Sequence, residues 1–209
     1  MCYHYHFQRP VKEVAKILRI DPNSIVGGDE IPGVVNGFNH PRLPVLVNKN
    51  IESLTWGLIP FWVKTEEMAH DLWNQTLNAR WETIHEKPSF QKIKQNRCIV
   101  PCTGFFEWKQ VGKTKIKHHI ESAQNDFLLL AGMFDEWVNP QTGEVLKSFS
   151  IITQPANELM SEIHNTKKRM PVLIDENKLD EWFGANYQEA VVPTPEWALK
   201  ATPEQSLLF

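Results

Sequence analysis

Residues 97–133, RCIVPCTGFFEWKQVGKTKIKHHIESAQNDFLLLAGM, decide the fold of this chain. Within this segment, branched and aromatic residues gather at 98–101, 104–109, 114–121 and 127–133, with turn-forming residues between them. Short apolar runs divided by turn residues are typical of neighbouring strands in a sheet. The segment therefore predicts a succession of β-strands.

Helices are predicted on both sides of this segment. Val11, Val14, Ala15 and Leu18 recur at helical spacing, and Asp21-Pro22 ends that helix. Residues 156–164 have the period of an amphipathic helix, and residues 177–183 form another that ends at Gly184. Residues 21–44 are rich in Gly, Pro and Asn and predict a long loop.

Further strands are predicted at 44–47, 54–58 and 146–153. The pattern predicts an α+β fold: a single β-rich domain with a strongly bent sheet or partly open barrel, flanked by helices. We expect this domain to occupy residues 1–184. Residues 185–209 are rich in Pro, Thr, Glu and Gln and predict a mobile C-terminal tail.

The composition is that of an ordinary globular protein, with 42% hydrophobic and 22% charged residues in 209. No apolar run is long enough to cross a membrane, and no secretory signal is visible. Three cysteines cannot all pair with one another, which favours free thiols in a reducing compartment. A net charge of −3 argues against a general nucleic-acid coat protein but leaves room for a local basic groove.

Cys2 follows the initiator methionine, and this position gives it unusual chemistry. Removal of Met1 would leave an α-amine and a thiol on the same residue. The amine, with a pKa of roughly 7.7–8.0, can condense with an aldehyde, and the thiol, with a pKa of about 8.5, can then close a thiazolidine ring. From position alone, an incidental or buried cysteine remains the simpler interpretation.

A series of short motifs favours a reactive Cys2 over an incidental one. They occur in the order Met1-Cys2, Trp56-Gly57-Leu58-Ile59-Pro60, Asn78-Ala79-Arg80, Arg97-Cys98-Ile99-Val100-Pro101, Gly104-Phe105-Phe106-Glu107-Trp108, Ile151-Ile152-Thr153 and Arg169-Met170-Pro171. In this order they resemble the SRAP family, the SOS response-associated peptidases that are also described as abasic-site processing proteins. The resemblance runs from Cys2 to about Ile174.

The resemblance implies a protein that senses abasic sites in single-stranded DNA and shields them through a covalent crosslink. Cys2 matches the crosslinking cysteine, Asn78 the residue that positions the opened sugar, Glu107 the catalytic glutamate, and His164 the histidine that assists proton transfer. Contacts with DNA are implied for Arg80, Arg169, Trp62, Trp108 and Thr153. No cofactor or metal is implied, and we expect a monomer in the cytoplasm that joins the nucleoid when bound to DNA.

Crosslinking to an abasic site requires acidic and basic groups of this kind. An abasic deoxyribose is mostly a closed hemiacetal, so an acid and a base must open it and later expel water. Glu107 lies between Phe106 and Trp108, a setting that favours a desolvated carboxyl with a shifted pKa. The chain also departs from the family: Tyr3-His4 replaces the usual Gly-Arg after the cysteine, and four residues separate His164 from Arg169.

Three other functions stay open. Cys2, His4 and His6 alternate, so on a strand they would share one face and could bind zinc. Cys2 could instead serve an N-terminal-nucleophile peptidase or amidohydrolase, with self-cleavage after Met1 as one origin of the free amine. The third alternative is a module that binds single strands without chemistry.

The last residues carry a separate prediction. Gln205-Ser206-Leu207-Leu208-Phe209 resembles the short peptide by which many bacterial repair proteins dock on the sliding clamp. The alternative is that these apolar residues fold back onto the domain's own surface.

Overall fold

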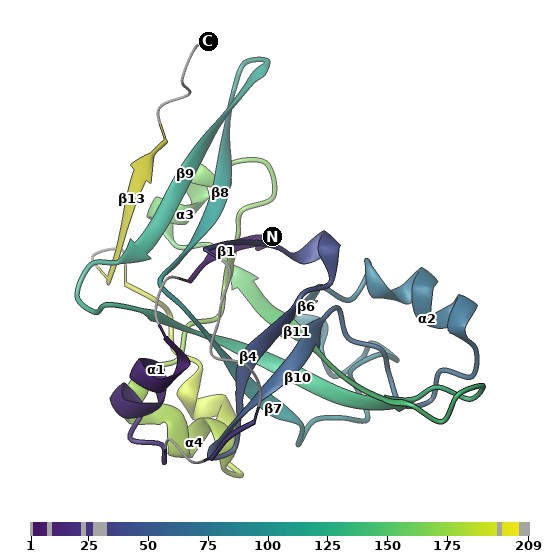
Figure 1. Cartoon of the computed structure of the whole chain (residues 1–209). Coiled ribbons are helices and arrows are strands. Elements are labelled where there is room, and N and C mark those ends of the chain that lie inside the picture. Colours follow the sequence, from purple (N-terminus) through teal and green to yellow (C-terminus); the bar gives the residue numbers. More distant parts are fainter. Residues whose placement is uncertain (1, 8–9, 22–23, 27–32, 196–197, 205–209) are drawn as a thin grey trace.

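The computed structural model describes residues 2–7, 10–21, 24–26, 33–195 and 198–204 (Figure 1). The five C-terminal residues of the predicted clamp peptide therefore lie outside the described residues. Within the described part of the chain, no helix has the length and apolarity needed to span a membrane.

Five strands form a barrel at the centre of the molecule. They are β4 (Arg42–Val47), β5 (Asn50–Trp56), β7 (Arg97–Cys102), β10 (Leu128–Val138) and β11 (Val145–Pro155). They pair in the order β11-β10-β7-β4-β5, and β5 then pairs with β11 in parallel, where Ser148 lies opposite Thr55 and Phe149 opposite Trp56. This contact closes the ring. The predicted β-rich α+β domain with a bent sheet or partly open barrel is thus confirmed.

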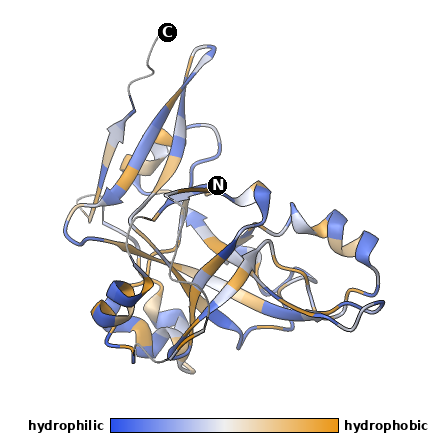
Figure 2. Cartoon of the chain, in the orientation of Figure 1, coloured by the Kyte–Doolittle hydropathy of each residue, from blue (hydrophilic) through white to orange (hydrophobic). Residues whose placement is uncertain are grey.

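Three short strands extend the barrel sheet. β2 (Ile25–Val26) pairs with β5, whereas β6 (Asn78–Arg80) and β12 (Arg169–Pro171) both pair with β11. The barrel interior is apolar, and Figure 2 shows hydrophobic and hydrophilic segments alternating along these strands. Trp56 is fully buried in this core and donates its indole N–H to the Leu77 carbonyl at 2.9 Å, so it is a packing residue of the barrel.

A second sheet stands against one side of the barrel. Its strands are β13 (Leu199–Pro203), β9 (Thr114–Ser122), β8 (Gly104–Val111), β1 (His4–His6) and β3 (Val34–Asn36), in that order. Only Thr103 separates β7 from β8, so the chain passes directly from the barrel into this sheet. The Thr103 amide and hydroxyl both donate to the His6 carbonyl at 2.8 Å. These bonds hold the start of the chain between β8 and β3.

The helices are short. They are α1 (Val11–Ile17), α2 (Glu66–Trp73), α3 (Glu158–Ile163) and α4 (Leu179–Phe183). The Asn157 side chain caps α3 by accepting from the Met160 amide at 2.9 Å, as expected of an asparagine at this position. α2 was not predicted, although Ala69, Leu72 and Trp73 recur at helical spacing and pack on one small apolar cluster.

Short 3-10 turns connect these elements: η2 (Gly37–Asn39), η3 (Trp81–Thr83), η4 (Glu176–Lys178) and η5 (Tyr187–Ala190). The predicted loop at 21–44 was only partly correct, since it contains β2, β3 and η2. The prediction of a mobile tail beyond Gly184 is wrong for β13. Its backbone pairs with β9 from Leu199 to Pro203, and Glu204 forms a 2.8 Å ion pair with Lys117. Sheet pairing orders this strand despite its polar composition.

Candidate functional site

The start of the chain meets β8 at a cavity of about 400 Å³. β1 runs antiparallel to β8, with His4 opposite Phe106, so the residues that precede His4 are directed toward Glu107 and Trp108. The cavity is lined by residues from β1, β8, β9 and the loop after α3: Tyr3, His4, Glu107, Trp108, Gln110, Lys115, His164, Thr166 and Lys167.

Glu107 is the buried acid of this cavity, with only 4% of its surface exposed. Burial raises the pKa of its carboxyl from 4.5 to about 7, although nearby positive charge, including that of Lys167, acts in the opposite direction. A carboxyl that titrates near neutrality can both give and take a proton at physiological pH. Glu107 therefore has the property required of a general acid and base.

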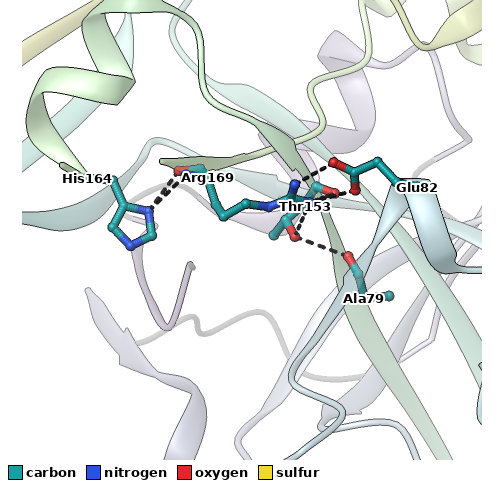
Figure 3. A network of polar contacts seen from close by, with 5 residues as sticks. All are labelled: Ala79, Glu82, Thr153, His164 and Arg169. Carbon is teal, nitrogen blue, oxygen red and sulfur yellow. Dashed lines mark hydrogen bonds and ion pairs between the residues drawn. The ribbon is translucent and has the colours of Figure 1, made fainter. Parts of the chain in front are cut away.

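His164 faces Glu107 from the C-terminal end of α3. Its Nδ1 lies 3.8 Å from a Glu107 carboxylate oxygen. The same nitrogen lies 2.9 Å from the Arg169 carbonyl (Figure 3). The Arg169 backbone amide also lies 3.3 Å from Nδ1, so the Arg169 backbone contacts this nitrogen through both its carbonyl and its amide. Burial lowers the pKa of His164, and the charges of Lys167 and Arg169 lower it further. Near pH 7 the imidazole is thus neutral beside a carboxyl that readily holds a proton.

The loop after α3 fixes the histidine in place. The Asn165 side chain accepts from the Gln110 amide at 3.1 Å and donates to the Gln110 carbonyl at 2.9 Å, which attaches the loop to β8. Lys168 has a positive φ of 50°, and its amide donates to the His164 carbonyl at 2.8 Å. This turn accommodates the four residues between His164 and Arg169.

Cys2 is fully buried at the same end of β8. Burial raises the pKa of its thiol, and the nearby Glu107 carboxyl and Cys102 thiol raise it further. The thiol Sγ lies 3.9 Å from the His4 carbonyl. The pairing of His4 with Phe106 brings the start of the chain to β8 next to Glu107, and Glu107 in turn raises the pKa of the Cys2 thiol. The predicted nucleophile and the predicted acid therefore share one neighbourhood. A thiol held neutral in this way needs a base to accept its proton when it reacts.

Asn78 opens β6, which lies beside β11 with Asn78 opposite Ile151. Within the described part of the chain, both polar atoms of its side-chain amide are buried without a hydrogen-bond partner. An unsatisfied buried polar atom costs roughly 1–3 kcal/mol, so such groups are usually kept for a purpose. The amide is therefore suited to hold a polar ligand.

Arg169 and Thr153 form a polar network with Glu82 (Figure 3). The Arg169 guanidinium pairs with both carboxylate oxygens of Glu82, at 2.9 Å for Nη2, and donates to the Thr153 carbonyl at 2.7 Å. The hydrogen bond that Arg169 donates to Glu82 lowers the pKa of the Glu82 carboxyl. Arg169 thus already has an anionic partner, and a DNA phosphate would have to compete with Glu82 for it.

Thr153 does not fit its predicted contact with DNA. The residue is fully buried, and its hydroxyl donates to the Ala79 carbonyl at 3.2 Å. Its position opposite Arg80 in the β11–β6 pairing makes it a support for β6 rather than a surface residue. Arg80 itself is exposed at the end of that strand, as a phosphate-binding residue should be.

The two predicted tryptophans lie in different places. Trp108 lines the cavity, and its ring lies 5.0 Å from that of His4, edge to face. Trp62 donates to the Pro88 carbonyl at 3.2 Å and packs on a separate small cluster around Trp137. Only Trp108 is therefore placed beside Glu107 and His164.

Lysines complete the cavity wall in a way that the sequence did not reveal. Lys115 lies opposite Gln110 on β9, and Lys167 follows α3. In the sequence, Lys115 belongs to a run of alternating lysines that is typical of a solvated strand face. The sequence offers one signal for its role, the hairpin formed by the runs at 104–109 and 114–121. Once the register of that hairpin is known, Lys115 and Trp108 fall on the same face of the sheet. In the described ranges, no three His, Cys, Asp or Glu side chains are grouped so that they could bind a metal ion.

The comparisons with known proteins agree with this geometry. Residues 1–207 match the family described as SOS response associated peptidase (SRAP). The abasic site processing protein YoqW of Bacillus subtilis (strain 168) is 40% identical over 138 residues, 65% of this chain and 58% of that protein. The abasic site processing protein HMCES of Gallus gallus is 32% identical over 177 residues, 75% of this chain and 50% of that protein. The alignments thus span only about half the length of these relatives.

Solved structures share the whole fold. A protein from Bacteroides thetaiotaomicron superposes with a TM-score of 0.91 at 34% identity, covering 98% of this chain and 93% of that one. A protein from Bordetella bronchiseptica, at 23% identity, shows the same fold with a TM-score of 0.82 over 98% of this chain and 100% of that one. With the match over residues 1–207, these findings show that the chain belongs to the SOS response associated peptidase (SRAP) family.

Proposed function

We propose that this protein recognises abasic sites in single-stranded DNA and crosslinks to them covalently through Cys2 after Met1 has been removed. The observation that carries this proposal is the buried pair of Glu107 and His164, 3.8 Å apart, in the electrostatic neighbourhood of Cys2. The relatives described as abasic site processing proteins support the choice of substrate.

The proposed reaction needs several proton transfers. Glu107 and His164 first move the proton of the sugar's C1′ hydroxyl to the ring oxygen, which opens the hemiacetal and exposes the aldehyde. The α-amine of Cys2 then adds to C1′ and forms a carbinolamine. The protonated Glu107 gives a proton to the leaving hydroxyl, and its carboxylate then takes the proton from the nitrogen, so that water and a neutral imine result.

Ring closure completes the reaction. The Cys2 sulfur adds to the imine carbon while its proton is transferred, through the basic partner of the pair, to the imine nitrogen. The product is a thiazolidine, and the balance is protein plus aldehyde giving adduct plus one water. The raised pKa of the thiol is compatible with this step, because attack and deprotonation occur together at a site that contains a base.

Asn78 and Arg80 have separable roles in this proposal. The unsatisfied amide of Asn78 would hydrogen-bond the opened sugar, whereas the exposed guanidinium of Arg80 would contact a phosphate. We expect Asn78→Ala to slow crosslinking at saturating DNA while binding changes little. We expect Arg80→Ala to weaken binding of DNA. The slope of log K against log salt concentration should fall by about 0.7, because this is the contribution of one phosphate contact on a single strand.

These expectations are checked by anisotropy titrations at several salt concentrations and by single-turnover crosslinking rates. If Arg80→Ala leaves the salt slope at its wild-type value, Arg80 does not contact a phosphate. If Asn78→Ala reacts at the wild-type rate, its amide does not position the sugar.

Intact mass spectrometry tests the function itself. The purified protein should have lost Met1, and with single-stranded abasic DNA it should gain the mass of the DNA minus one water. The adduct should survive heating. Intact DNA should give no adduct, and an uninterrupted abasic duplex should react more slowly, because insertion of Cys2 at a sugar requires an unpaired strand. Equal rates on single strands and duplex would contradict the proposed substrate form.

A peptidase remains the second candidate, since the family description names one and Cys2 could attack an amide by the same route. Turnover of peptide amides in the absence of abasic DNA, without any mass adduct when the DNA is added, would favour that function.

A further inference from the structure

The outer face of the second sheet carries a row of rings and cations that begins at the cavity. In an antiparallel pair, residues directly opposite each other share a face of the sheet. His4 lies opposite Phe106, Phe106 opposite His119, and Trp108 opposite Lys117. Because side chains alternate along a strand, Phe106 and Trp108 also share that face. These residues therefore share one face across β1, β8 and β9. Phe106 is only 3% exposed and forms the floor of this face, beneath His119 and Lys117.

The rings on this face contact one another. Phe106 and His119 stack at 4.8 Å, and the His4 ring lies 5.0 Å from that of Trp108. The Lys117 ammonium lies 3.8 Å above the Phe106 ring centroid. We name His4, Phe106, Lys117 and His119 the ring strip. It continues the cavity wall, where Trp108 and Lys115 belong to the same face.

We propose that the ring strip is the track along which single-stranded DNA leaves the cavity on one side of the abasic sugar. This inference rests on the proposed function, and it names the surface that holds the flanking nucleotides. Aromatic side chains interleaved with cations are the features that bind single strands without sequence preference. Burial lowers the pKa values of His4 and His119, so near pH 7 both rings are neutral and suited to stacking.

Charge limits the length of the track. Beyond His119, this face of the sheet borders a second cavity of about 480 Å³. Its lining includes the acids Glu13, Glu121 and Asp126, whose negative charges repel phosphate. From Gln110 to Phe106 the strand rises roughly 13 Å. At the B-form spacing of ~3.4 Å per phosphate, this length holds no more than about four nucleotides.

Glu204 modulates the track. It forms a 2.8 Å ion pair with Lys117, and its amide donates to the Lys117 carbonyl at 2.9 Å. A DNA phosphate must therefore compete with this carboxylate for the lysine. Removing the carboxylate should strengthen binding of DNA, whereas removing the lysine should weaken it.

The test measures binding of undamaged single-stranded oligonucleotides by fluorescence anisotropy at several salt concentrations. The double variant Lys115→Gln/Lys117→Gln should reduce the salt slope by about 1.4, two contacts at 0.7 each. His119→Ala should weaken binding about five-fold or more through lost stacking. Glu204→Gln should bind more tightly than the wild type. Lys147→Gln is the matched control, because that lysine pairs with Glu52 and Glu136 on the barrel, and it should bind as the wild type does.

The outcomes separate this inference from the proposed function. A wild-type salt slope in the double variant, or no gain with Glu204→Gln, would overturn the track even if the protein crosslinks abasic DNA normally. Changes in the expected directions would support the track even if the wild type formed no crosslink, since undamaged DNA reports binding alone.

Discussion

Cys2→Ala is expected to form no heat-stable adduct with abasic single-stranded DNA under conditions in which the wild type reacts to completion. Alanine keeps the α-amine and loses only the thiol, so the reaction should stop at the imine. That imine should be visible only after reduction with borohydride. Gel analysis of heated samples, with and without borohydride, checks this result.

Cys102→Ala is the matched control for this experiment. Cys102 is as fully buried as Cys2 and lies near enough to affect the pKa of Cys2, but the proposed reaction does not use its thiol. It should crosslink with a heat-stable product. A heat-stable adduct in Cys2→Ala, or a wild-type adduct that also requires borohydride, would exclude the thiazolidine.

Glu107→Gln is expected to slow crosslinking by roughly 10²–10⁴-fold, the usual contribution of general acid–base catalysis. Glutamine keeps the shape of the side chain and can neither give nor take the proton. The wild-type rate should depend on a group that titrates near pH 7, the pKa to which burial raises Glu107, and this dependence should disappear in the variant. The titration of the Cys2 α-amine, at about pH 8, should remain in both proteins. Single-turnover rates between pH 5 and 9 measure both effects.

The same substitution should stabilise the fold at neutral pH. The pKa of Glu107 is 4.5 as an ordinary carboxyl and about 7 in the folded protein, so the folded state binds more protons between these values. The contribution of this carboxyl to the free energy of unfolding is fully present below pH 4.5, and it is lost as the pH rises through 7. At ~1.36 kcal/mol per pKa unit, the loss reaches about 3 kcal/mol, and the uncharged glutamine avoids it.

Urea unfolding at pH 4.5 and pH 8 tests this expectation. The free energy of unfolding of Glu107→Gln, relative to the wild type, should increase between the two pH values. Glu162→Gln on α3 is the control, because this carboxylate is 67% exposed and lies 3.9 Å from Lys109, so its difference from the wild type should change little. An unchanged difference for Glu107→Gln would mean that the carboxyl is not held in a desolvated state.

Most strands of the molecule were predictable from local pattern alone. The runs at 98–101, 104–109, 114–121, 127–133 and 146–153 became β7 to β11 with ends extended by a few residues. The strands of two or three residues were missed, because they are shorter than any periodic pattern that a sequence can display: β1, β2, β3, β6 and β12. β13 was missed because its polar residues resemble a tail until β9 is placed beside them.

The candidate site shows the same division. Cys2 and Glu107 could be selected from the sequence because their chemistry belongs to a single residue and its neighbours: an amine beside a thiol, and an acid between two aromatic rings. The assignments of Thr153 and Trp62 to a DNA contact could not be judged there. Burial of Thr153 and the separate packing of Trp62 depend on strands and loops far away in the chain.

The sequence by itself determined the strand pattern, the β-rich class, the family motifs and the reactive position of Cys2, all of which depend on residues close together in the chain. Only the tertiary structure decided that His164 reaches Glu107, that Arg169 is held by Glu82, and that the β1–β8–β9 face joins the cavity. The physical reason is register and burial. Which side chains meet, and which lose their water, depends on pairings between segments that are tens of residues apart.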